Sequence, residues 1–142
     1  MRIYFACSIV GGRQDEAIYR HIVQALLDDG HTVPTAANAG VLAAGEPGME
    51  IDLAPQEVYS RDIGWIDDSD ALIAEVSTPS HGVGYEIGYA LEYQKPVLCI
   101  FRQGVRVSKM ITGNTKPGLT LADYANEQEA IEDVRNFLAN LS

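Results

Sequence analysis

A short apolar run that leads through a turn of small residues into a helical pattern most constrains how this chain can fold. The run is Ala-Leu-Ile-Ala at residues 71–74, the turn is Ser-Thr-Pro-Ser-His-Gly at residues 77–82, and the helical pattern covers residues 83–94. A strand, a turn and a helix in this order form the building unit of an open parallel sheet. The unpaired N–H groups at the start of such a helix suit a bound anion. This stretch therefore predicts both a fold class and a ligand site.

The same alternation of strand and helix patterns continues along the chain. Short apolar runs predict further strands, and stripes of apolar residues at helical spacing predict helices: residues 2–7, 31–33, 97–101 and 119–124 for strands, and residues 14–29, 56–68 and 127–141 for helices. Together they predict an α/β three-layer sandwich, flavodoxin-like or Rossmann-like, with a five-stranded parallel sheet in the order 2-1-3-4-5. A single domain of residues 1–142 is expected, with the ligand crevice beyond the ends of the first and third strands.

Composition limits the partners of the protein. The net charge is -10, from 20 acidic and 10 basic residues, which argues against broad contact with nucleic acid or an anionic membrane. No apolar run approaches the length of a membrane span, and the amino terminus lacks the layout of a signal peptide, so we expect a cytoplasmic protein. Cys7 and Cys99 fall in or next to predicted strands and are expected to be buried thiols.

Several common ligand motifs are absent. The spacing Gly82-x-Gly84-x-x-x-Gly88 departs from the dinucleotide fingerprint, and the chain has neither a P-loop nor the G-x-S-x-G turn of serine hydrolases. Its cysteines and histidines lack the spacing of a metal site, so neither a metal nor a cofactor is expected. His81 lies in the turn and is a candidate for ligand contact.

Two carboxylates are candidates for catalysis. Glu86 falls in the first turn of the helix predicted after residue 82, where the helix dipole favours an ionised carboxylate, although dipole compensation alone would also explain it. Asp62 lies four residues after Val58 and four before Ile66, on the apolar side of its helix, where a carboxylate needs a partner or a role. Two carboxylates across one cleft can cleave a bond at an anomeric carbon. The alternative is that Asp62 is only a partnered helix residue.

Several segments resemble one enzyme family in its own order along the chain. They are MRIYFACSIVGGR at the amino terminus, RDIGW at residues 61–65, AEVSTPSHGVGYEIG at residues 74–88, and LCIFR with SKMI at residues 98–102 and 108–111. These segments resemble the 2'-deoxynucleoside 5'-monophosphate N-hydrolases of the nucleoside 2-deoxyribosyltransferase superfamily. The resemblance implies hydrolysis of the N-glycosidic bond of a nucleotide to a free base and 2-deoxyribose 5-phosphate, through a covalent glycosyl-enzyme intermediate.

The resemblance also implies roles for individual residues. Glu86 matches the nucleophile that attacks C1' of the sugar, Asp62 matches the carboxylate that assists departure of the base, and Tyr4 matches the tyrosine that positions the nucleophile. Phosphate and sugar would be held by serines and by backbone amides at glycines: Ser8, Ser80 and Ser108, with Gly11, Gly12 and Gly82. In the family, the serine at the position of Ser108 comes from the neighbouring subunit, so a homodimer is implied.

Three other activities stay open from the sequence. They are transfer of deoxyribose between bases, hydrolysis of ribonucleotides, and nucleotide binding without catalysis. Base preference is not predicted, because family members often have Thr-Glu-His after the second strand, whereas residues 34–38 here are Pro-Thr-Ala-Ala-Asn. Ser8 and Ser80 both follow predicted central strands, where an open sheet binds phosphate.

Overall fold

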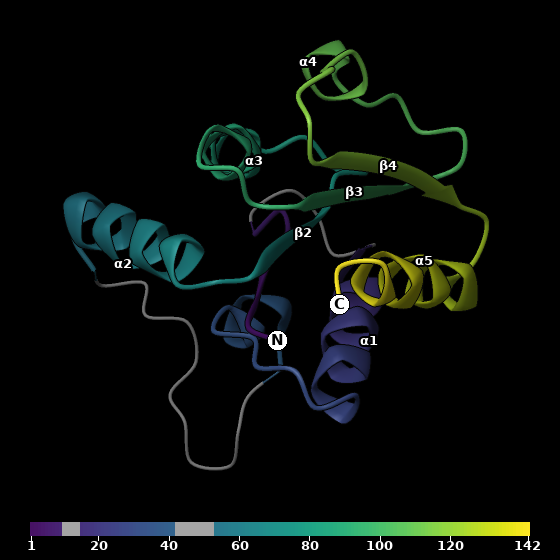
Figure 1. Ribbon diagram of the computed structural model, residues 1–142, viewed down its shortest axis with the longest axis horizontal. Helices are drawn as coiled ribbons and strands as arrows, with labels where there is room; N and C mark the ends of the chain where they lie inside the picture. Colours follow the sequence, from purple (N-terminus) through teal and green to yellow (C-terminus); the bar gives the residue numbers. More distant parts are fainter. Residues whose placement is uncertain (10–14, 42–52) are drawn as a thin grey trace.

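The computed structural model describes residues 1–9, 15–41 and 53–142 of the chain (Figure 1). Strands and helices alternate along it, as the sequence patterns predict. The elements in chain order are β1 (Ile3–Ala6), α1 (Glu16–Asp28), the 3-10 helix η2 (Ala36–Ala39), α2 (Pro55–Asp67), β2 (Ala71–Glu75), α3 (His81–Glu92), β3 (Val97–Arg102), α4 (Lys109–Thr112), β4 (Leu119–Tyr124) and α5 (Glu127–Ala139).

The strands form a parallel sheet covered by helices on both faces. β1 pairs with β2, β2 with β3, and β3 with β4, all in parallel. Successive side chains of a strand point to opposite faces, so Ile3 and Phe5 pack with α1 and α5, while Tyr4 and Ala6 pack with α2 and α3. Figure 1 shows the same division, with α1 and α5 away from α2 and α3. The three layers of the predicted sandwich are present.

The predicted five-stranded sheet in the order 2-1-3-4-5 is wrong. The described residues contain a four-stranded sheet in the order β1-β2-β3-β4. Residues 31–33, expected as the second strand, make one isolated bridge, between Arg2 and Thr32. Pro34 then has no N–H to continue the pairing. The Thr35 hydroxyl forms hydrogen bonds with both main-chain groups of Phe5 in place of a neighbouring strand. Its Oγ1 accepts from the Phe5 N–H at 3.0 Å and donates to the Phe5 carbonyl at 2.7 Å. The remaining order is consistent with a flavodoxin-like fold.

The core agrees with the expectations for the thiols. Cys7 and Cys99 are buried and are not joined in a disulfide.

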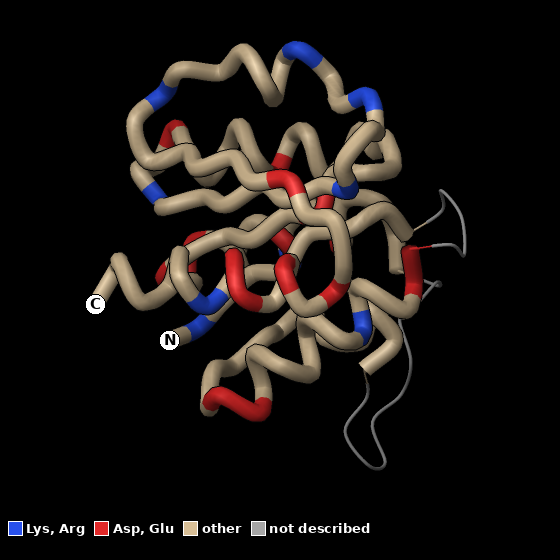
Figure 2. The backbone as a smooth tube through the Cα atoms, turned by 90° about the vertical axis from the view of Figure 1, so that its right-hand side faces the viewer, with Lys and Arg blue, Asp and Glu red and all other residues tan. Residues whose placement is uncertain are grey.

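Along the described backbone, Figure 2 shows the Lys and Arg positions separated from one another rather than gathered in one basic stretch. In the same residues, no helix is both long and apolar enough to cross a membrane.

Candidate active site

Helix α3 begins one residue after Ser80, and this start decides where its side chains point. The Ser80 hydroxyl accepts a hydrogen bond from the Val83 N–H at 3.3 Å, so Ser80 caps the helix as its sequence position predicts. Glu86 is the sixth residue of the helix and lies in its second turn. The expectation that Glu86 belongs to the first turn is therefore wrong.

Tyr4 and Glu86 are joined directly although they are 82 positions apart in the sequence. The Tyr4 hydroxyl, from β1, donates a hydrogen bond to Glu86 Oε2. Tyr4 lies on the sheet face that α3 covers and is 2% exposed. Because this hydrogen bond holds one carboxylate oxygen, Tyr4 fixes the orientation of the Glu86 side chain from the sheet.

The surroundings of Glu86 work against its ionised form. Burial raises the pKa of Glu86 to about 7, the hydrogen bond from Tyr4 lowers it, and the negative charge of Asp62 raises it. The expectation of a carboxylate kept charged by the helix dipole is wrong, because the dipole effect fades beyond the first turn and desolvation exceeds it. Near neutral pH, Glu86 is therefore divided between its protonated and ionised forms.

Tyr4 stays a hydrogen-bond donor under these conditions. Burial is the first reason that the pKa of Tyr4 lies far above its ordinary value, and the charges of Glu86 and Asp62 raise it further. The phenol therefore keeps its proton, and its hydrogen bond favours the ionised form of Glu86.

Asp62, on α2, completes a group of three side chains from three elements. Its side chain is 23% exposed, and its Oδ1 accepts a hydrogen bond from Arg61 Nε at 3.1 Å. The Arg61 guanidinium in turn lies 4.7 Å from the ring centroid of Trp65. Asp62 thus has a partner on its own helix, and its charge also acts on Tyr4 and Glu86. The two predicted carboxylates therefore lie close enough for the charge of Asp62, on α2, to act on Glu86, on α3.

Gly82 lies between this group and the cap of α3. A Cβ added at Gly82 would be 3.9 Å from Glu86 Oε1 and 4.0 Å from Ser80 Oγ. Gly82 therefore lies beside both side chains, and a Cβ at this position would be in ordinary van der Waals contact with each of them. Ser8 follows β1 and is 9% exposed. Gly11 and Gly12 lie outside the described residues.

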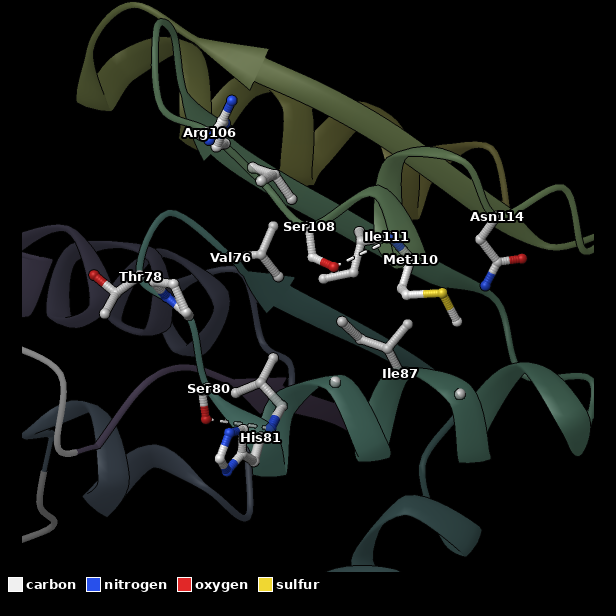
Figure 3. A pocket seen from close by; sticks show the side chains of 15 residues that line it. Val76, Thr78, Ser80, His81, Ile87, Arg106, Ser108, Met110, Ile111 and Asn114 are labelled. Atoms are coloured by element: carbon white, nitrogen blue, oxygen red, sulfur yellow. Dashed lines mark hydrogen bonds between the residues drawn. The ribbon is translucent and has the colours of Figure 1, made fainter.

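Ser80 also borders a pocket of about 420 Å³ between α3 and α4 (Figure 3). Ser108 lines this pocket together with His81, and its hydroxyl accepts from the Met110 N–H at 3.2 Å at the start of α4. The lining does not include Tyr4, Asp62 or Glu86. Helix α3 therefore separates two groups of predicted site residues, and Ser80 is at the end common to both.

Two buried carboxylates near this site were not singled out by sequence analysis. Asp15 and Glu75 are each 0% exposed. The signal available for Glu75 was an acidic residue at the end of an apolar strand, and Asp15 gave only an ordinary helix start. Among the described residues, no group of three or more His, Cys, Asp or Glu side chains is placed to hold a metal ion.

A family model described as nucleoside 2-deoxyribosyltransferase matches residues 3–133 of the chain. The chain belongs to this family. The matched range contains all three members of the Tyr4, Asp62 and Glu86 group and every predicted phosphate-binding position.

Two relatives match almost end to end. One from Tetraodon nigroviridis, named 5-hydroxymethyl-dUMP N-hydrolase, is 39% identical over 144 residues, covering 99% of this chain and 99% of the relative. One from Nematostella vectensis, with the provisional name 2'-deoxynucleoside 5'-phosphate N-hydrolase 1, is 38% identical over 142 residues, covering 99% and 95%. A solved structure of a Clostridium botulinum CMP N-glycosidase superposes with a TM-score of 0.69 at 19% identity, covering 95% of this chain and 99% of that one. At that identity, the superposition supports the fold alone.

Proposed function

We propose that this protein hydrolyses the N-glycosidic bond of 2'-deoxynucleoside 5'-monophosphates to a free base and 2-deoxyribose 5-phosphate. The observation that carries the proposal is the hydrogen bond from Tyr4 to Glu86 beside the charge of Asp62. A retaining glycosidase needs a nucleophilic carboxylate and a second carboxyl group that handles a proton. The names of the two full-length relatives support the same reaction.

The chemistry follows from the two oxygens of Glu86. Oε2 accepts from Tyr4, which leaves Oε1 to attack C1' of the sugar. As the bond from C1' to Oε1 forms, the bond from C1' to the base breaks, and its electron pair goes to the base nitrogen. Asp62, in its protonated form, gives its proton to that nitrogen as the base leaves. Water then attacks C1' and gives a proton to the Asp62 carboxylate, while the bond from C1' to Oε1 breaks and its electron pair returns to Glu86, which releases the sugar 5-phosphate.

A panel of nucleotides tests the proposal. The protein is incubated with dGMP, dAMP, dCMP, dTMP, 5-hydroxymethyl-dUMP and the ribonucleotides, and released bases are separated by chromatography. We expect base release from at least one deoxyribonucleotide. Folded protein that releases no base from any of them would refute the proposal. Release from ribonucleotides alone would identify a ribosidase, and a new nucleoside formed on addition of a second free base would identify a transferase.

The pH dependence of the reaction should report Glu86. Because its pKa is about 7, kcat/KM is expected to fall by about tenfold per pH unit on the acidic side of that value, where the nucleophile is protonated. The hydrogen bond from Tyr4 lowers the pKa of Glu86. Tyr4→Phe removes this bond, so the pKa of Glu86 should rise and the acidic limb should move to higher pH. The substrate phosphate has a pKa of about 6 with either the wild type or the variant. The difference between their two pH profiles therefore reports the change in the pKa of Glu86 alone. An acidic limb that Tyr4→Phe leaves in place would contradict the assignment.

Ser80 is proposed to hold the 5'-phosphate together with the amino end of α3. Ser80→Ala is expected to raise KM by about tenfold with kcat changed by less than about threefold, because a bond to a charged group is lost in both ground and transition states. The lost cap should also lower the melting temperature. Ser80→Asp is the matched control, since it keeps a cap but places a negative charge beside the phosphate. It should retain stability and raise KM further; normal KM in both variants excludes the role.

We also propose a homodimer in which Ser108 reaches the site of the partner. Ser108 is exposed, and the neighbouring Met110 is 84% exposed, which supports an interface around α4. Glu86→Gln and Ser108→Ala variants test it. In a mixed dimer with a shared site, one site has both Glu86 and Ser108, so mixing the two should give activity above the mean of the separate variants. Activity equal to that mean, or a monomer in sedimentation, would contradict the shared site.

We expect one cytoplasmic domain to carry this function, which fractionation of cells can test.

A further inference from the structure

Asp15 is a fully buried carboxylate that the proposed reaction does not use. It occupies the position before α1, yet its side chain accepts no hydrogen bond from that helix, although Asp at this position ordinarily does so. Instead, Oδ2 accepts from Thr78 Oγ1 at 2.6 Å, and Oδ1 accepts from the guanidinium of Arg102. Asp15 thus ties α1 to the turn after β2 and to the end of β3. The pairing with Arg102 compensates its buried charge.

The turn between β2 and α3 is held from a second side as well. Ser77 Oγ accepts from the Arg102 N–H at 2.9 Å, and the Ser77 N–H donates to Glu75 Oε1 at 2.5 Å. In Figure 3, the hydroxyl of Thr78 points away from Ser108 and the pocket that Ser108 lines. The side chains of Ser77 and Thr78 are therefore bonded to the protein itself, and the path of the turn is determined by α1 and β3 together.

We propose that Asp15 and Thr78 are positioning residues for phosphate binding. They fix the turn so that Ser80, two residues after Thr78, and the first N–H groups of α3 face the 5'-phosphate. This inference rests on the proposed function, because the phosphate is that of its substrate. Asp15 acts through Thr78 and not by contact, since its own negative charge would repel a phosphate.

Thr78→Val tests the inference, because it removes the hydroxyl and keeps the shape of the side chain. The substrate is the fastest nucleotide of the panel, with inorganic phosphate and the matching nucleoside as competitive inhibitors. We expect KM and the inhibition constant of phosphate to rise by about tenfold, while kcat changes by less than about threefold and the nucleoside constant by less than about twofold. Thr78→Ser, which restores a hydroxyl, should return both phosphate-dependent constants toward the values of the wild type.

A general loosening of the fold would give a different result. It would weaken the binding of phosphate and of the nucleoside to the same extent, and that outcome overturns the inference. The inference is also overturned if Thr78→Val leaves KM and the inhibition constant of phosphate unchanged. In a Ser80→Ala background, Thr78→Val should raise KM by less than it does in the wild type, because the Ser80 contact is already lost and only the N–H groups of α3 are still positioned by the turn; full additivity would also overturn the inference. Asp15→Asn, which turns an amide donor toward Thr78 or Arg102, replaces Thr78→Val should the latter fail to fold. Wild-type protein that releases no base refutes the proposed function, whereas active wild type with a normal Thr78→Val refutes this inference alone.

Discussion

The variant Glu86→Gln is expected to lose nearly all turnover and to keep nucleotide binding. An amide cannot form the ester with C1', and the reaction has no second carboxylate at that position, so kcat should fall by about 10⁴-fold or more. Gln has the same length and can still accept from Tyr4, which should leave the phosphate side of the site unchanged. Single-turnover base release and calorimetric titration with the same nucleotide measure the two effects separately. Undiminished turnover would exclude Glu86 as the nucleophile.

The same variant should be more stable than the wild type above neutral pH. Burial raises the pKa of Glu86 from 4.5 to about 7, so the folded protein binds this proton more tightly than the unfolded chain does. The wild type therefore loses stability as pH rises from about 4.5 to about 7, by up to about 3 kcal/mol, and Gln removes this cost. The variant should melt at a higher temperature than the wild type at about pH 8, and the difference should disappear below about pH 4.5, where Glu86 is protonated in both the folded and the unfolded state. A lower melting temperature for Glu86→Gln than for the wild type at alkaline pH would contradict a raised pKa of Glu86.

The sequence predicted those parts of the fold that depend on local patterns. The apolar run at residues 71–74 and the small turn after it became β2 and the start of α3, and Ser80 caps that helix. The strand expected at residues 31–33 failed for one local and one tertiary reason. Pro34 ends the pairing and is visible in the sequence, whereas the sequence does not reveal that the Thr35 hydroxyl bonds to both main-chain groups of Phe5.

The candidate site was predicted less completely, because its properties arise between elements. The resemblance to a family supplied Tyr4, but no spacing links it to Glu86 across 82 positions. The pKa of Glu86 depends on burial against β1 and α2, which a helix position alone does not disclose. Asp15 illustrates the same limit, since its partners Thr78 and Arg102 lie 63 and 87 positions away.

Asp62→Asn is expected to produce the second large loss of turnover, and its signature should differ from that of Glu86→Gln. Without the carboxyl group that handles the proton of the departing base, kcat should fall by about 10²-fold to 10³-fold. The loss should be much smaller with 7-methyl-dGMP, whose cationic base leaves without taking up a proton. Base release from dGMP and 7-methyl-dGMP under identical conditions measures this ratio. Equal losses on both nucleotides would assign Asp62 to sugar binding alone.

Removing the charge of Asp62 should also shift the pH profile in a defined direction. The negative charge of Asp62 raises the pKa of Glu86, so Asp62→Asn should move the acidic limb of kcat/KM to lower pH, opposite to Tyr4→Phe. Asp68→Asn is the matched control, since Asp68 is an exposed acidic residue at the end of the same helix. It should leave both rate and profile unchanged. Because burial of Glu86 is common to all these variants, opposite shifts from its two neighbours would identify Tyr4 and Asp62 as the groups that set its charge during catalysis.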